Sequence, residues 1–148
     1  MKKRVMVLYK KFDESKKVFI PEYKTEGSSG LDLSSVEDVV LFPRQTKMVS
    51  TNLSVEIPEG YEIQIRPRSG LAAKHSITVL NAPGTIDSDY RGEIKVILHN
   101  LGTYDFNISK GDRIAQMVLA KVEKMKLFES ELSETERNEG GFGSTGNK

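Results

Sequence analysis

The chain has 148 residues, with 22 basic and 21 acidic side chains, two histidines and neither cysteine nor tryptophan. This length is typical of one domain, and it buries enough surface for a core without disulfides or a structural metal. The absence of cysteine excludes thiolate metal centres and cysteine nucleophiles. A net charge of +1 excludes the surplus of basic residues that a nucleic-acid-binding surface needs.

The first predicted element is a strand. The basic start Met1-Lys2-Lys3-Arg4 is followed by an apolar run of four residues, 5–8, which is too short for a signal peptide. Apolar stretches elsewhere are far shorter than the ~20 residues that cross a membrane. We therefore expect a cytoplasmic protein with no membrane partner.

Two segments with alternating apolar and polar residues follow, at residues 53–57 and 61–66. This alternation is typical of half-buried strands. Pro58-Glu59-Gly60 lies between them and has the residue types of a tight turn. We therefore predict that the two segments form a hairpin.

The one predicted helix is short. It covers Leu71-Ala72-Ala73-Lys74-His75, with Ser69 as a candidate N-cap. Exposed N–H groups at a helix N-terminus, with Arg68 beside them, suit an anion. A surface ion pair is the alternative role for Arg68.

Further short apolar segments, at residues 77–80, 93–98 and 114–122, are bounded by Gly, Pro, Asn or Asp. Many short strands at a spacing of about ten residues predict an all-β barrel or sandwich. Between two of these strands, residues 81–93 contain two carboxylates and a tyrosine. This segment is either a long loop with solvated charges or a site in which one carboxylate activates a water.

The last nineteen residues differ in composition, because only two of them, Leu132 and Phe142, are large and apolar. Such a segment cannot bury enough apolar surface to order itself. We predict a domain of residues 1–129 and a flexible arm of residues 130–148. Glycine, serine and threonine in residues 140–146 suit phosphate oxygens, although plain disorder is the alternative.

Five segments in order resemble the motifs of the trimeric deoxyuridine triphosphate nucleotidohydrolase (dUTPase) family. They are Ser29-Gly30-Leu31-Asp32-Leu33-Ser34, Pro67-Arg68-Ser69-Gly70, Gly84-Thr85-Ile86-Asp87-Ser88-Asp89-Tyr90-Arg91-Gly92-Glu93, Gly111-Asp112-Arg113-Ile114-Ala115-Gln116, and residues 137–146.

The resemblance implies a distorted jelly-roll or β-barrel subunit of the β-clip type, and a homotrimer whose active sites are shared between chains. It implies Mg²⁺-dependent hydrolysis of dUTP to dUMP and pyrophosphate, by attack of water on the α-phosphorus. This reaction limits uracil incorporation into DNA and supplies dUMP for thymidylate synthesis. No nucleic-acid partner is implied.

The resemblance also assigns roles to residues. Asp87 activates the attacking water, and Tyr90 packs under the deoxyribose, where it leaves no room for a 2′-hydroxyl. Asn81 and the backbone of residues 92–96 hydrogen-bond the uracil. Substrate contacts in this part of the chain are expected from Asn81, Gly84, Tyr90 and Lys95.

The phosphates are expected to lie against the other motifs. Asp32 contacts water molecules of the Mg²⁺, which the triphosphate itself mainly holds, and Arg113 has a structural role. In the arm, Phe142 stacks on the base while polar groups clasp the terminal phosphates. The expected phosphate and arm contacts are Arg68, Ser69, Gly70, Gln116, Arg137, Phe142, Gly143, Ser144 and Thr145.

Two departures and two alternatives accompany this interpretation. Leu31 stands where many relatives carry an aromatic residue, and Glu139 places a negative charge in the phosphate-binding arm. The first alternative is a dCTP deaminase. Those enzymes share the fold, but they resemble this chain poorly in the glycine-rich arm. A non-catalytic nucleotide-binding protein is disfavoured because Asp87, Tyr90 and Gln116 are all present.

Overall fold

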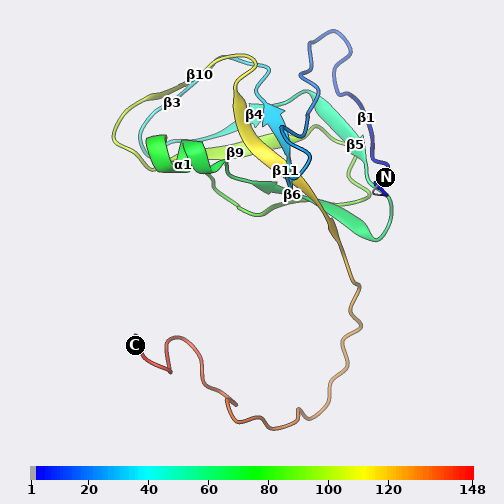
Figure 1. The fold of residues 1–148 in the computed structure, drawn as a ribbon, viewed down its shortest axis with the longest axis vertical. Coiled ribbons are helices and arrows are strands. Elements are labelled where there is room, and N and C mark those ends of the chain that lie inside the picture. Colours follow the sequence, from blue (N-terminus) through cyan, green and yellow to red (C-terminus); the bar gives the residue numbers. More distant parts are fainter. Residues whose placement is uncertain (1–2) are drawn as a thin grey trace.

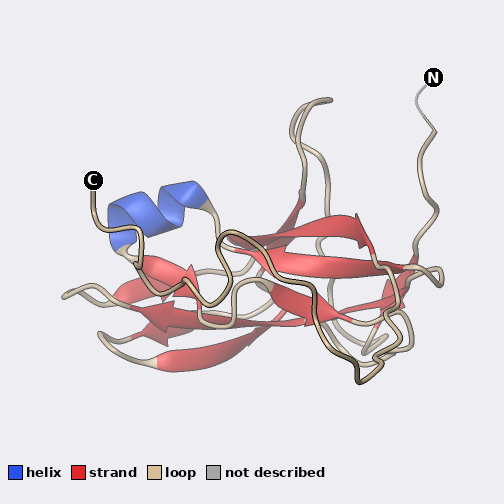
Figure 2. Cartoon of the chain, turned by 90° about the horizontal axis from the view of Figure 1, so that it is seen from below, coloured by secondary structure: helices blue, strands red, loops and turns tan. Residues whose placement is uncertain are grey.

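Strands make up almost all of the regular structure of residues 3–148, which are the residues that this computed structural model describes. Figure 2 shows the strands, with the short helix at one end. This confirms the prediction of an all-β fold. The elements are β1 (Leu8–Lys11), β2 (Leu31–Ser34), β3 (Val39–Leu41), β4 (Thr46–Ser50), β5 (Leu53–Glu56), β6 (Tyr61–Arg66), α1 (Ser69–His75), β7 (Ile77–Val79), β8 (Gly84–Ile86), β9 (Lys95–Asn100), β10 (Phe106–Ile108) and β11 (Arg113–Lys121).

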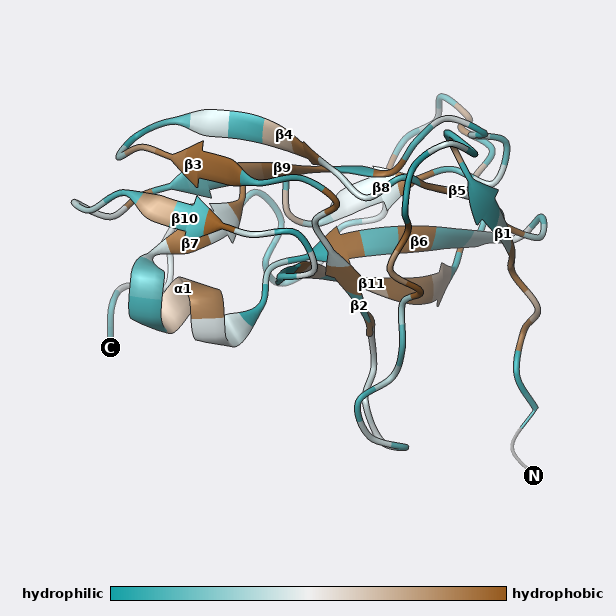
Figure 3. Ribbon diagram, turned by 90° about the horizontal axis from the view of Figure 1, so that it is seen from above, coloured by the Kyte–Doolittle hydropathy of each residue, from teal (hydrophilic) through white to brown (hydrophobic). Residues whose placement is uncertain are grey.

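The strands form two layers with short pairs at their edges. One sheet has the order β2-β11-β6-β8 and a second has the order β4-β9-β7, while β1 pairs with β5 and β10 with β3. Figure 3 shows β4 and β9 above β6 and β11. All the strand pairings among the described residues are antiparallel, as in a distorted jelly roll.

The core lies between these layers, and it is filled by the apolar side chains at every second position of the strands. Ile63 and Ile65 on β6 and Val96 and Leu98 on β9 are buried, while their neighbours in sequence are more exposed. Asn100 is fully buried, and its side-chain amide donates to the carbonyl oxygens of Leu41 and Tyr104 at 2.9 Å each. A buried polar group is tolerated there because its hydrogen bonds are satisfied.

The predicted hairpin of residues 53–57 and 61–66 is wrong. The turn exists, since Tyr61 N–H donates to the Pro58 carbonyl at 3.2 Å and Gly60 has a φ of 87°. However, β5 pairs with β1, whereas β6 pairs with β11 and β8. Alternation reports which side chains are buried but does not identify the neighbouring strand.

Two predicted boundaries also differ. The first strand is β1 at Leu8–Lys11 rather than residues 5–8, because its register places Leu8 opposite Glu56 at the end of β5. Ser69 is the first residue of α1 rather than its N-cap. The N-cap is Arg68, whose extended backbone accepts the Ala72 N–H at 3.1 Å and whose side chain does not cap the helix.

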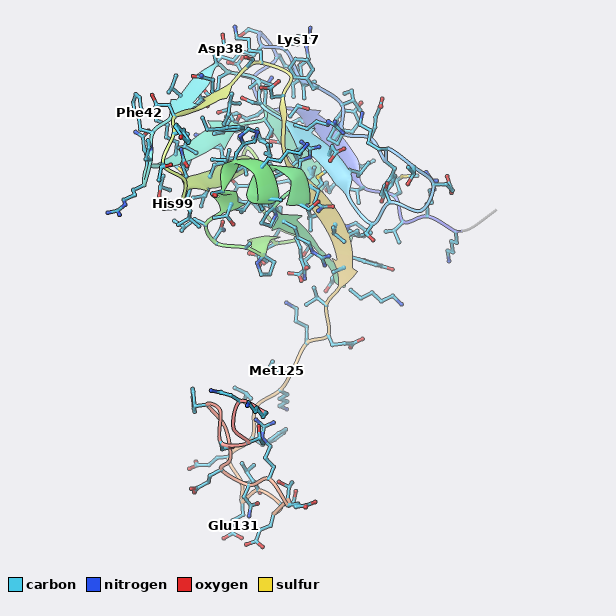
Figure 4. The ribbon with its side chains drawn as sticks, turned by 60° about the vertical axis from the view of Figure 1, so that its left-hand side comes forward. Lys17, Asp38, Phe42, His99, Met125 and Glu131 are labelled. Atoms are coloured by element: carbon cyan, nitrogen blue, oxygen red, sulfur yellow. The ribbon has the colours of Figure 1, made fainter. Side chains whose placement is uncertain are left out.

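After β11 the chain leaves the body. Val122 N–H donates to the Gly60 carbonyl at 2.9 Å, and the following residues run away from the sheets (Figure 1). Met125 and Glu131 lie well outside the body in Figure 4. The division after residue 129 stays a prediction.

Candidate functional site

Five of the predicted site residues line one open pocket of about 480 Å³. The pocket lies beside β8, which is the outer strand of the four-stranded sheet. On this strand Gly84 is paired with Ile65 of β6. Apolar side chains of the core close the pocket floor. The predicted residues at this pocket are Asn81, Gly84, Asp87, Tyr90 and Lys95.

Gly84 allows the Asn81 amide to lie close to the sheet. A Cβ at Gly84 would lie 3.2 Å from Asn81 Nδ2 and 3.2 Å from the Cβ of Ile65. Both contacts are tighter than ordinary packing. The glycine therefore provides the space in which an amide able to pair with a base edge is placed.

The position of Tyr90 depends on a second glycine. Its hydroxyl donates to the Glu93 carbonyl at 2.8 Å, and its ring lies across Gly92. A Cβ at Gly92 would come within 2.9 Å of Tyr90 Cε2. The Tyr90 ring therefore lines the pocket in a defined orientation.

The loop around Tyr90 is held on both sides. Arg91 donates to the Ser88 carbonyl at 2.6 Å and to Glu56 Oε1 at 3.2 Å. Ser54 Oγ donates to the carbonyl oxygens of Arg91 and Gly92 at 3.2 and 3.1 Å. These bonds make the loop a preformed part of the body.

Asp87 follows β8 directly and is exposed. It lines both the pocket of Tyr90 and a neighbouring hollow of about 920 Å³. Its carboxylate has no hydrogen bond or ion pair with another residue in the described part of the chain. An unengaged carboxylate at the rim of a pocket can accept a proton from a water.

A second group of predicted residues lies on the same four-stranded sheet, farther from β8. The register places Asp32 of β2 opposite Gln116 of β11, which in turn lies opposite Arg66 of β6. Gln116 Nε2 donates to the Pro67 carbonyl at 3.0 Å. A Cβ at Gly30 would lie 2.8 Å from Gln116 Oε1, so the glycine leaves the space that the Gln116 side chain occupies.

Asp32 is enclosed by two arginines. Arg113 Nη1 lies 3.2 Å from Asp32 Oδ2, and Arg68 Nε lies 3.8 Å from Asp32 Oδ1. Arg68 Nη1 also donates to the Arg113 carbonyl at 3.0 Å. Two arginines and one carboxylate leave surplus positive charge, which suits a polyanion.

The start of α1 adds backbone donors beside Arg68. Ser69 and Gly70 are exposed and are its first two residues, so their N–H groups have no partner within the helix. The first turn contains no acidic residue. These groups can therefore donate to anionic oxygens near the Arg68 guanidinium.

The predicted arm residues lie apart from both groups. Arg137 Nε donates to the Gly140 carbonyl at 2.7 Å, and the other hydrogen bonds of residues 135–146 are likewise within the arm. Phe142 is fully exposed. The arm residues concerned are Arg137, Phe142, Gly143, Ser144 and Thr145.

The residues present fit a metal ion that arrives with a ligand. Over residues 3–148, no three His, Cys, Asp or Glu side chains form a group that could hold a metal. Mg²⁺ is commonly bound by one or two carboxylates together with substrate phosphates. Asp32, which is paired with Arg68 and Arg113, is a carboxylate that could contact such an ion through water.

Three participants were not predicted from the sequence. Phe12 and Met48 line the pocket of Tyr90, and the arginine pair around Asp32 includes Arg113, for which only a structural role was expected. Phe12 lies in a segment without a motif, and Met48 is one of several apolar residues on a strand. Nothing in the alternation distinguishes them. In the described residues, no helix is long and apolar enough to span a membrane.

Comparison with known proteins agrees with the geometry. The family model dUTPase matches residues 16–146. The deoxyuridine 5′-triphosphate nucleotidohydrolase of Hydrogenobaculum sp. (strain Y04AAS1) is 60% identical over 131 residues, covering 87% of this chain and 91% of its own. That of Nautilia profundicola is 57% identical over 133 residues, covering 89% and 94%.

Solved structures are similar as well. The dUTPase of Staphylococcus bacteriophage 80alpha with dUPNHPP has a TM-score of 0.86 and 28% identity, covering 96% of this chain and 99% of that chain. A phage phi11 dUTPase of S. aureus, described with a structural Mg(II) ion, has a TM-score of 0.79 at 24% identity, covering 88% and 100%, and shows the shared fold. The motifs, the fold and these relatives together establish that the chain belongs to the dUTPase family.

Proposed function

We propose that this protein hydrolyses dUTP to dUMP and pyrophosphate. The observation that carries the proposal is the open pocket of Asn81, Tyr90 and Asp87, because it combines an amide for a base edge, an aromatic surface and an unengaged carboxylate. The match to the family over residues 16–146 supports it. The phage 80alpha relative binds the analogue dUPNHPP.

In the proposed reaction, the Asp87 carboxylate accepts a proton from a water whose oxygen attacks the α-phosphorus. The bond from that phosphorus to the bridging oxygen breaks, and pyrophosphate leaves. Asn81 and the backbone of residues 92–96 hold the uracil, and Tyr90 packs against the deoxyribose. A positioned base of this kind contributes about 10²- to 10⁴-fold in rate.

The phosphates are proposed to lie against the positive cluster. Phosphate oxygens accept hydrogen bonds from Arg68, from the Ser69 and Gly70 N–H groups and from Gln116. These bonds hold the triphosphate in line for attack. Asp32 would contact water molecules of the hydrated Mg²⁺. Bound Mg²⁺ supplies neutralisation of the triphosphate charge and orientation of the α-phosphorus.

We further propose that the protein acts as a homotrimer with shared sites. Arm contacts come from Arg137, Phe142, Gly143, Ser144 and Thr145. The arm has no hydrogen bond to the body of its own chain in the described residues, which suits an arm that closes over the site of a neighbouring copy. The body is assigned residues 1–129 and the arm residues 130–148.

A substrate panel tests the proposal. Pyrophosphate release is measured with dUTP, dCTP, dTTP and UTP, with Mg²⁺ and with excess EDTA. We expect pyrophosphate from dUTP with Mg²⁺, and weak or no release from the other three. Absence of release from dUTP, or ammonia from dCTP, contradicts the proposal.

A further inference from the structure

Phe12 is an unassigned part of the wall of the Tyr90 pocket. It directly follows β1, and together with Met48 and Ile97 it lines the pocket that also contains Asn81 and Tyr90. Its side chain is 55% exposed. An aromatic side chain that remains half exposed beside a binding pocket can bury its surface against a bound ligand.

The backbone around Phe12 continues from the β1–β5 pairing at Lys11 and is then bonded repeatedly to one residue, Asn52. Phe12 N–H donates to the Asn52 carbonyl at 3.1 Å. Asn52 Oδ1 accepts the Asp13 N–H at 2.8 Å. Asn52 Nδ2 lies within hydrogen-bond distance of three carbonyl oxygens, those of Asp13 at 3.1 Å, Lys16 at 3.2 Å and Lys17 at 3.0 Å.

Asn52 is suited to this task by burial and backbone conformation. It is 2% exposed and has a φ of 57°, in the left-handed region that asparagine tolerates better than most residues. Its amide is satisfied entirely by the loop of residues 12–17. Loss of the amide would remove its hydrogen bonds to part-buried backbone groups of Asp13, Lys16 and Lys17, which loosens that loop.

The same residue also contacts Glu93, which lines the pocket as well. Asn52 N–H donates to Glu93 Oε2 at 2.9 Å. The Glu93 carbonyl in turn accepts the Tyr90 hydroxyl at 2.8 Å. The next residue, Leu53, accepts the Ile94 N–H at 2.8 Å. Asn52 therefore joins the Phe12 loop to the segment that carries Tyr90.

We propose that Phe12 contacts the bound nucleoside as a wall of this pocket, and that Asn52 is the positioning residue that holds Phe12 there. The proposal rests on the assignment of the Tyr90 pocket to the nucleoside. It makes two separate claims. Phe12 affects binding of the substrate, and the Asn52 amide affects it through Phe12.

A double-mutant cycle tests both claims. Phe12→Ala, Asn52→Gly and the double variant are compared with the wild type for KM and kcat with dUTP. Glycine is used at Asn52 because it keeps the positive φ and the N–H to Glu93 while it removes the amide. We expect each single variant to raise KM about fivefold to tenfold with kcat within about twofold, and the double variant to match the singles.

Three controls separate positioning from folding. Phe12→Leu keeps apolar bulk, so its KM should stay close to that of the wild type. Phe42 is a similarly exposed phenylalanine outside the pocket, and Phe42→Ala should leave KM unchanged. Amide hydrogen exchange measures how firmly the loop of residues 12–17 is held, independently of enzyme activity. The Asp13 amide should exchange faster in Asn52→Gly than in the wild type.

An unchanged KM in Phe12→Ala overturns the role of Phe12. Effects of Phe12→Ala and Asn52→Gly that multiply, or a fall in kcat alone, overturn the positioning role. Wild-type turnover of dUTP is measured in the same assay. If the wild type has none, the proposed function fails, whereas altered ratios between variants and wild type concern only this inference.

Discussion

The Asn81–Lys95 segment and the arm after residue 130 are both proposed to bind the nucleotide, but they are held in opposite ways. Gly92 and Glu93 hold Tyr90 in place through packing and a 2.8 Å hydrogen bond. The arm has only short turns of its own, and Phe142 is fully exposed. One region is preformed, whereas the other is proposed to lose its conformational freedom only when the ligand binds.

The largest expected effect comes from the preformed region. Asp87→Asn should lower kcat at least about 100-fold, because the amide cannot accept the proton of the attacking water. Binding of dUPNHPP should remain within about twofold of the wild type. Turnover and calorimetric binding provide the two measurements.

Asp89→Asn is the matched control, since Asp89 is an exposed carboxylate two residues away that does not line the Tyr90 pocket. It should retain turnover. Loss of turnover in Asp89→Asn but not in Asp87→Asn would reverse the assignment of the base.

Removal of residues 136–148 tests the other region. We expect kcat/KM to fall about 50-fold, because stacking and charge-assisted hydrogen bonds to the phosphates are lost together. The thermal unfolding temperature should not change, because the arm makes no hydrogen bond to the body in the described residues. Removal of residues 147–148 alone is the control.

A shortened chain that unfolds at a lower temperature would show that the arm stabilises the body. That result would remove the contrast between the two regions. Normal turnover of the shortened chain would exclude the arm from the site.

Gly92→Ala tests how strictly Tyr90 is held. A Cβ there would come within 2.9 Å of Tyr90 Cε2, so the ring must move. Misplacement of a contact group should raise KM for dUTP about tenfold. Gly27→Ala is the control, since a Cβ at Gly27 meets no atom within 4 Å. Equal effects of the two variants would contradict the packing argument.

The smallest effect is expected at Phe142. Phe142→Ala should weaken kcat/KM about fivefold, since stacking of a base on an aromatic ring contributes about 1–3 kcal/mol. Phe142→Tyr keeps the ring and should remain close to the wild type. Steady-state kinetics distinguish them, and equal losses in both variants would show that stacking is not the role of this residue.

The sequence predicted the strands well where alternation is strong, as in β6 and β9, because alternation reflects burial within one strand. It did not predict the partners of β5 and β6, which join different sheets. It missed Phe12 for a related reason. Phe12 donates to the backbone carbonyl of Asn52, 40 positions away in the sequence, and the next residue, Asp13, donates to the buried Asn52 side chain.

Local chemistry by itself therefore determined the all-β class, the five motifs and the family of this protein. These depend on neighbouring residues, and each motif carries its own glycines and polar groups. The tertiary structure decided which motifs meet. It placed Asp32 between Arg68 and Arg113 and gathered Asn81, Asp87 and Tyr90 at one pocket. Strand pairing and buried hydrogen bonds between distant segments are properties of the packed chain, which no local pattern contains.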